Sequence, residues 1–120
     1  MNKKSRKKIL VVDDDNDILD VMKLILNVHG YDVKVSRANE VDLMIKNNHP
    51  DLIFMDVLLS GNDGREISKK LKSDNETKDI PIILISALPD AEKSAQQIGI
   101  DFLAKPFELK DLLSKVSRYC

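Results

Sequence analysis

The chain has 120 residues, enough for one domain with one core but too few for two. It is 42% hydrophobic and 32% charged, and its net charge of -1 gives no reason to expect direct binding to nucleic acid. No apolar stretch is long enough to span a membrane. The single cysteine, Cys120, excludes a disulfide framework and a cysteine zinc site. It fits a reducing cytoplasm.

The first eight residues include five Lys or Arg residues. Such a basic segment can bind an anionic partner, but a solvated chain end is the more common case, so we expect residues 1–7 to be frayed. The apolar run at residues 9–12 is cut short by three aspartates. We therefore do not expect a signal peptide here.

Short, apolar, β-branched segments alternate with segments of helical period along the whole chain. Strands are predicted over residues 9–12, 32–35, 52–55, 81–86 and 101–104. Helices are predicted over residues 17–30, 39–48, 63–73, 90–99 and 108–119. The pattern gives five strand–helix units without an internal repeat or a linker.

Two of the predicted helices have a clear apolar face, and one has very little. The first is expected to turn one set of apolar residues to the sheet: Ile18, Val21, Met22, Ile25 and Val28. The last is expected to bury Leu109, Leu112, Leu113, Val116 and Tyr119. The fourth is polar and has little to bury, which is typical of an element that can move.

Strands that are apolar throughout are covered on both faces, which indicates a parallel sheet with helices on each side. Right-handed crossovers then lead to a doubly wound arrangement. The sequence therefore predicts an α/β fold, a three-layer sandwich around a five-stranded parallel sheet in the order 2-1-3-4-5. We expect a single domain over residues 1–120.

Polar side chains follow four of the five predicted strands, and ligands bind at this carboxyl edge in open α/β sheets. The second strand delivers none, which suits a strand at the edge of the sheet. The groups at the carboxyl edge are Asp13, Asp14, Asp15, Asp56, Ser86 and Lys105.

Carboxylates gathered at one edge repel each other, by about 4 kcal/mol for two charges about 4 Å apart at an effective dielectric of about 20. A hard divalent cation relieves this repulsion, and Mg²⁺ with carboxylate ligands and retained waters fits best. Lys105 adds a cation and Ser86 a hydroxyl donor. This set of groups indicates phosphoryl chemistry with Asp56 as the nucleophile.

Each of these groups also has an ordinary structural interpretation. Asp15 or Asn16 can cap the first helix, a strand-terminal serine is often a turn cap, and a Lys-Pro pair is usually part of a loop. Their order on successive strand–helix units is more specific than any one of them alone.

Five segments of the sequence resemble the response-regulator receiver domain, the family that includes the chemotaxis protein CheY. They are ILVVDDD, DLIFMD, NDG, ILISA and FLAKPF, and the resemblance extends from Lys8 to Tyr119. It implies a fold of the flavodoxin and CheY type. It also implies a signalling phosphoacceptor that catalyses only its own phosphorylation and dephosphorylation.

The resemblance assigns a metal site to the first and third strands. Asp13 and Asp14 would be the acidic pair, with Asp14 a direct Mg²⁺ ligand. Asp56 would be both the phosphoacceptor and a metal ligand, and the backbone carbonyl of Leu58 would be a further ligand. One departure from the family is Ser60, which replaces the usual proline four residues after the phosphoacceptor and should leave the loop looser.

The resemblance also assigns a switch. Ser86 would bond the phosphoryl group, Lys105 would pair with it, and Phe102 would be the aromatic switch residue. The Lys105–Pro106 bond is expected to be cis. Phosphorylation would alter a surface made by the fourth helix, fifth strand and fifth helix, roughly residues 90–120.

The implied partners are proteins. A sensor histidine kinase or phosphotransfer protein would supply the phosphoryl group, and a downstream target or a separate output domain would use the switched surface. The resemblance implies neither direct nucleic-acid binding nor a membrane partner.

Four other classes of protein share part of this pattern. A haloacid dehalogenase-type phosphatase matches Asp13 and Asp15, but Asp17 stands where its motif requires Thr or Val. An EF-hand fails because Ile18 and Leu24 replace its glycine and glutamate. A flavin carrier lacks its Ser/Thr/Gly-rich phosphate loop. A receiver-like protein-interaction scaffold that is not phosphorylated is the remaining alternative, and the complete set of site residues argues against it.

Overall fold

The computed structural model describes residues 6–120. The part of the predicted frayed end that covers residues 1–5 lies outside the described residues. Five parallel strands form the main sheet: β1 (Lys8–Val12), β2 (Asp32–Ser36), β3 (Leu52–Asp56), β6 (Ile82–Ser86) and β7 (Asp101–Ala104). Their order is β2-β1-β3-β6-β7, so the predicted sheet and its strand order are confirmed, with β6 and β7 as the predicted fourth and fifth strands.

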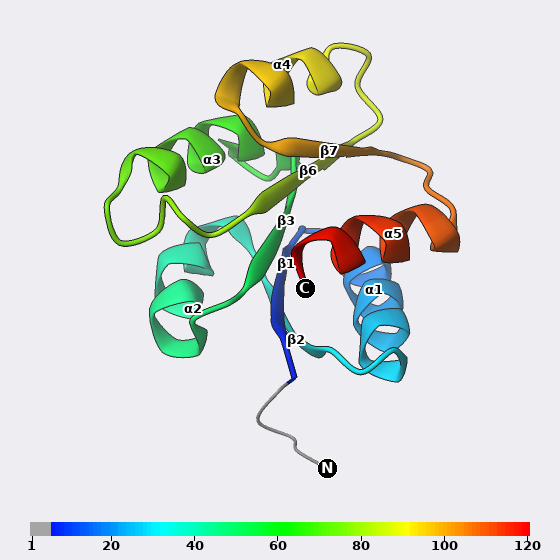
Figure 1. The fold of residues 1–120 in the computed structure, drawn as a ribbon. Coiled ribbons are helices and arrows are strands. Elements are labelled where there is room, and N and C mark those ends of the chain that lie inside the picture. The colour runs from blue at the N-terminus through cyan, green and yellow to red at the C-terminus, as the bar shows by residue number, and fades with distance from the viewer. Residues whose placement is uncertain (1–5) are drawn as a thin grey trace.

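Five α-helices connect the strands: α1 (Asn16–Val28), α2 (Val41–Asn48), α3 (Gly64–Ser73), α4 (Ala91–Ile98) and α5 (Leu109–Tyr119). As Figure 1 shows, α1 and α5 cover one face of the sheet, and α2, α3 and α4 cover the other. Within residues 6–120 there is no helix with both the length and the apolar character needed to cross a membrane.

Alternate residues of each strand supply two separate cores. In β1, Ile9 and Val11 pack toward α1 and α5, whereas Leu10 and Val12 pack toward α2, α3 and α4. All four are essentially inaccessible to solvent. Burial on both faces is the reason that the strands are apolar throughout, and it fixes the register that brings their carboxyl ends to one edge.

The predicted inward face of α1 is partly wrong. Val21 and Val28 are 51% and 73% exposed, and the fully buried residues are Leu19, Met22 and Leu26. Apolar residues occupy most of the circumference of this helix, so their spacing alone does not select the buried side. In α5 the one error is Leu109, which is 49% exposed.

Two small elements were not predicted from the sequence. A single 3-10 turn, η2 (Ala38–Glu40), precedes α2. An antiparallel hairpin of β4 (Leu58–Leu59) and β5 (Asn62–Asp63) follows β3. The two-residue turn between them is Ser60 and Gly61, and the positive φ of Gly61, 69°, is what makes glycine favourable there.

A partly buried ion-pair cluster joins β7 to α5. The carboxylate of Asp101 accepts hydrogen bonds from Lys115 Nζ at 2.7 Å and Tyr119 Oη at 2.8 Å, and Arg118 Nη1 lies 3.3 Å away. Burial acts to raise the pKa of Asp101, but the bonds from Lys115 and Tyr119 outweigh it and hold that pKa below the usual value. The ionised form is therefore the one that the fold favours.

Replacing Asp101 with Asn should lower the free energy of unfolding by about 1–3 kcal/mol at pH 7, because two partly buried donors lose a charged acceptor. A lowered pKa contributes stability above the unfolded value, and this stability is lost as pH falls through the folded value. The difference from the parent should therefore shrink on acidification below about pH 4. Urea unfolding across that range measures it, with Asp111→Asn on an exposed site of α5 as the matched control. Equal losses in the two variants would contradict the assignment.

Candidate functional site

The carboxyl edge of the sheet brings together polar residues that are far apart in the sequence. Asp13 directly follows β1, Asp56 is the last residue of β3, and Ser86 is the last residue of β6. Lys105 follows β7, and its N–H donates to the Ser86 carbonyl at 2.9 Å. The register pairs Val12 with Met55, so Asp13 and Asp56 end neighbouring strands at the same height.

The ammonium group of Lys105 bridges two buried carboxylates. Its Nζ lies 3.1 Å from Asp13 Oδ2 and 3.1 Å from Asp56 Oδ1. Asp13 is only 2% exposed and Asp56 only 7%. In this structure, therefore, a lysine within the fold provides the positive charge between the two carboxylates. The sequence predicts both cations at this edge, Mg²⁺ and Lys105, and the structure places Lys105 there.

Lys105 does not fully compensate the negative charge on Asp56. Burial of the carboxyl group, and then repulsion from Asp13, raise the pKa of Asp56 despite the bond from Lys105. Burial acts to lower the pKa of Lys105, but the two carboxylates outweigh it and raise that pKa. Lys105 thus stays protonated, and additional positive charge at this edge would stabilise the ionised form of Asp56.

Asp14 is directed differently from Asp13. Its carboxylate accepts a hydrogen bond from the backbone N–H of Ser60 in the β4–β5 turn. The side chain of Asn62 donates to the Ser60 carbonyl at 3.2 Å. These two bonds hold the turn at the position where the family usually has a proline.

The residues assigned to Mg²⁺ fit it by donor chemistry, because they supply carboxylate and carbonyl oxygens with too little positive charge between them. Within residues 6–120, however, there is no cluster of three or more His, Cys, Asp or Glu side chains that is already arranged to hold a metal. One oxygen of Asp14 instead accepts the Ser60 N–H, and Lys105 lies between Asp13 and Asp56.

The proposed switch residues lie on β6 and β7. Ser86 is 2% exposed, and its Oγ accepts a hydrogen bond from the Leu88 N–H at 2.9 Å. Phe102 is half-buried and packs against the core formed with α2, α3 and α4. The Lys105–Pro106 peptide bond is cis, as expected from the resemblance.

Gly64 explains the glycine of the NDG segment. It is the first residue of α3, and its N–H donates to the Val57 carbonyl at 2.9 Å. A β-carbon at this position would collide with the backbone carbonyl oxygen of Asp56. The start of α3 is therefore packed directly against the backbone of the candidate nucleophile.

One polar group at this edge was missed by the sequence analysis. Arg37 directly follows β2, the strand that was expected to deliver none. Its guanidinium donates to Asn16 Oδ1 at 2.7 Å and to the Asp14 carbonyl at 3.3 Å. An arginine in a polar loop carries no motif, so only the strand register could have indicated its position.

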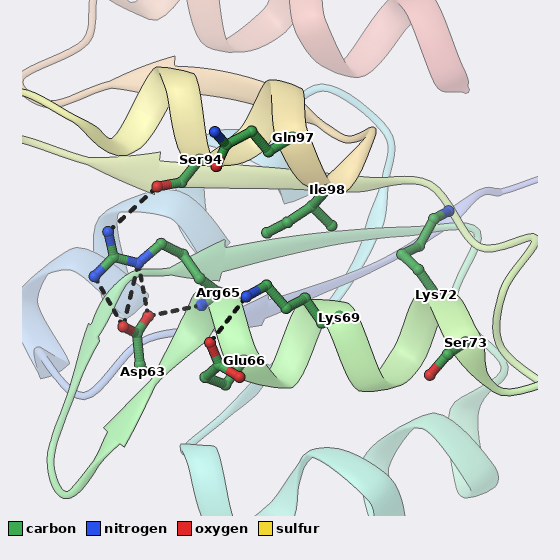
Figure 2. Close-up of a pocket in the computed structure, with 9 residues that line it drawn as sticks. All are labelled: Asp63, Arg65, Glu66, Lys69, Lys72, Ser73, Ser94, Gln97 and Ile98. Carbon is green, nitrogen blue, oxygen red and sulfur yellow. Dashed lines mark hydrogen bonds and ion pairs between the residues drawn. The ribbon is translucent and has the colours of Figure 1, made fainter.

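A hollow of about 630 Å³ lies between α3 and α4, away from Asp56. Figure 2 shows the guanidinium of Arg65 between Asp63 and Ser94, and Lys69 beside Glu66. Arg65 also lies 3.7 Å from Asp90. Arg65 and Lys69 are each paired with a carboxylate, and Lys72 donates to the Lys78 and Ile80 carbonyls. Arg65 thus links the beginning of α3 to the beginning of α4.

Comparison with known proteins gives a consistent result. The family model described as the response regulator receiver domain matches residues 9–117. The chain is similar to the nisin biosynthesis regulatory protein NisR of Lactococcus lactis, with 38% identity over 91% of this chain and 48% of the relative. It is also similar to the phosphate regulon transcriptional regulatory protein PhoB of Pseudomonas aeruginosa, with 32% identity over 92% of this chain and 50% of the relative.

The solved structures that resemble this fold include the chemotaxis protein CheY4 of Vibrio cholerae, with a TM-score of 0.87 and 25% identity over 97% of this chain and 100% of that chain. The chain thus matches the full length of that structure. In contrast, it spans about half the length of the two curated regulators.

Proposed function

Because the chain belongs to the response regulator receiver domain family, we propose that it accepts a phosphoryl group on Asp56 from a sensor histidine kinase or a phosphotransfer protein. The observation that carries the proposal is the position of Lys105 Nζ, 3.1 Å from both Asp13 and Asp56 at the carboxyl edge of the sheet. A buried carboxylate beside a permanent cation is a nucleophile with a built-in partner for the phosphoryl oxygens.

In the proposed reaction, a carboxylate oxygen of Asp56 attacks the phosphorus of the donor. A P–O bond forms to Asp56 as the P–N bond of the donor phosphohistidine breaks, and the histidine nitrogen keeps the electron pair. Lys105 pairs with the transferred phosphoryl oxygens. Asp13, Asp14, Asp56 and the Leu58 carbonyl would hold Mg²⁺, which when bound supplies electrostatic stabilisation of the same oxygens. The chain catalyses only this transfer and the later hydrolysis, in which water takes the phosphoryl group from Asp56 and releases inorganic phosphate.

The added charge then acts on the switch residues. Ser86 exchanges the hydrogen bond from Leu88 for one that its hydroxyl donates to the phosphoryl group, and Phe102 follows the shift. The surface of α4, β7 and α5 changes with them. Only Ala91 and Ala95 of α4 are buried, so its attachment to the sheet is weak and a small free energy suffices to move it.

The partner of that surface is a protein. The matched relatives named above are regulators about twice as long as this chain, which favours an output domain or a separate downstream target as the recipient of the signal. Recognition by the receiver involves neither nucleic acid nor a membrane in this proposal.

The test is incubation with acetyl phosphate and Mg²⁺ followed by intact mass measurement. The proposal requires the gain of one phosphoryl group that is located on Asp56 by peptide mapping. The alternative, an interaction scaffold that is not phosphorylated, requires no gain under the same conditions. The fold and the surface of α4, β7 and α5 are common to both, so this measurement separates them.

Mg²⁺ should stabilise the protein against heat, because only the folded chain gathers the carboxylates that would hold it. At a hundredfold excess over Kd, a ligand specific for the native state adds about 2.7 kcal/mol, or several degrees in Tm. The increase in Tm should be much smaller in Asp14→Ala. Asp17→Ala removes the same charge from the exposed first turn of α1 and should keep the full response. Equal responses in the parent and Asp14→Ala would contradict the metal site.

A further inference from the structure

The end of β2 places an arginine beside the acidic segment that follows β1. In the parallel register, Val12 pairs with Ser36, and the Asp13 N–H donates to the Ser36 carbonyl at 3.1 Å. Arg37 is the next residue, in an extended conformation with φ -96° and ψ 167°. Its backbone therefore lies level with the acidic segment that follows β1.

The charge of Arg37 is not cancelled by a carboxylate. Its two hydrogen bonds go to neutral oxygens, the Asn16 side-chain carbonyl and the Asp14 backbone carbonyl. Within residues 6–120, Arg37 forms no ion pair, whereas Arg65 and Arg118 each pair with an aspartate. The bonds to neutral groups hold the guanidinium in place and leave its charge available to an incoming anion.

A hollow of about 260 Å³ lies beside this guanidinium. It is lined on one side by the segment after β2, on the other by the β4–β5 turn, and by Asp14 between them. The lining residues are Asp14, Arg37, Ala38, Asn39, Ser60 and Asn62. Since Asp14 belongs both to this hollow and to the proposed Mg²⁺ site, the hollow adjoins the place where a donor must enter.

We propose that Arg37 binds the phosphoryl group of the incoming donor and guides it to Asp56. The donor is anionic, and with Mg²⁺ bound the three carboxylates are only balanced by the metal and Lys105, so the site has no excess positive charge to attract it. The planar fork of the Arg37 guanidinium matches phosphoryl oxygens and supplies that excess charge. This inference rests on the proposed phosphoacceptor function and adds a donor-binding residue to it.

The test compares the rate of phosphorylation at saturating Mg²⁺ as the donor concentration is varied. In Arg37→Gln, the half-saturating concentration of acetyl phosphate should rise about five- to tenfold, with a maximal rate close to that of the parent. The difference in half-saturating concentration between Arg37→Gln and the parent should become smaller as ionic strength rises, because the contact between Arg37 and the donor is electrostatic and exposed. Gln keeps the polarity and can still bond to Asn16, and Arg37→Lys should recover part of the loss.

The second arm uses phosphoramidate, which carries its phosphoryl group on nitrogen as a phosphohistidine does. Both donors should show the rise, because the phosphoryl oxygens are what they share. If the half-saturating concentration rose only for acetyl phosphate, the proposal would be overturned, because Arg37 would then contact the acetyl group rather than the phosphoryl group.

The matched control is Lys34→Gln, which removes one positive charge from an exposed position on β2, three residues before Arg37. It should leave the half-saturating concentration unchanged. An equal rise in both variants would mean a general charge effect, and no rise in Arg37→Gln would exclude donor binding. Either result overturns the role of Arg37 without affecting the phosphoacceptor assignment, whereas a parent protein that takes up no phosphoryl group would overturn both.

Discussion

Replacing Asp56 with Asn is expected to abolish phosphoryl uptake from acetyl phosphate while leaving the domain folded. A neutral amide is nearly isosteric with the carboxylate but cannot attack phosphorus as a carboxylate oxygen does. Lys105 would keep Asp13 as a charged partner at 3.1 Å, so the cation would not be left unpaired. Intact mass measurement after incubation with Mg²⁺ and acetyl phosphate gives the result directly.

The same substitution should not destabilise the fold at neutral pH. Burial and repulsion from Asp13 raise the pKa of Asp56, which means that the folded state opposes its ionised form. With a raised pKa, stability is lost as pH rises from the unfolded value through the folded value, and the loss is complete above it. The Asn variant should therefore melt at or above the melting temperature of the parent at pH 7. This difference in melting temperature should disappear on acidification below the ordinary aspartate pKa of 3.8.

Asp51→Asn is the matched control, because it makes the same chemical change beside the opposite end of the same strand. Asp51 is exposed and accepts a hydrogen bond from the Lys8 N–H at 2.8 Å. This variant should take up a phosphoryl group as the parent does. A phosphoryl group found on Ser86 or Asp13 in the Asp56→Asn protein would mean that another residue is the acceptor.

The sheet could be predicted from the sequence because the same apolar pattern recurs in four of its five strands. Four strands are apolar at nearly every position, and burial on two faces leaves few other interpretations of such runs as Leu52–Asp56. The parallel arrangement then determines which residues share an edge. That is why the sequence alone predicts Asp56, Ser86 and Lys105 at one edge of the sheet.

The predictions failed where the sequence signal was ambiguous or very local. Because α1 has apolar residues on most sides, its sequence predicts that Val28 is buried. Packing against the sheet buries Leu19 and Leu26 instead. The β4–β5 hairpin has strands of two residues, too short for a periodic pattern. Its turn glycine, Gly61, was the one available signal.

The electrostatics of the site depended on distances that no sequence pattern provides. The acidic cluster predicts a neutralising cation, but only the structure shows that Lys105 lies within 3.1 Å of both Asp13 and Asp56. Arg37 was overlooked because its importance comes from the register of β2 rather than from a motif. Both residues show that the positive charges of this site come from the ends of strands distant in the sequence.

Gly64→Ala is expected to cause the largest loss of stability of any single-methyl addition near the site. The new β-carbon would collide with the carbonyl oxygen of Asp56 and would lie 3.0 Å from Met55 Cγ. The carbonyl is backbone in the central strand of the sheet and cannot rotate away, so either α3 or the end of β3 must move. We expect the free energy of unfolding to fall by about 3 kcal/mol or more, measured by urea unfolding.

Gly61→Ala provides the comparison, since it adds the same methyl group in the adjacent turn. A β-carbon there meets no atom within 4 Å, and the only penalty is the positive φ of 69°, about 1 kcal/mol. The difference between the two variants isolates the collision at Asp56 from the general cost of replacing glycine.

Because the displaced backbone is that of the candidate nucleophile, Gly64→Ala should also slow phosphorylation of the molecules that remain folded, whereas Gly61→Ala should not. Similar losses of stability in the two variants would mean that α3 is not held against Asp56 as the structure places it.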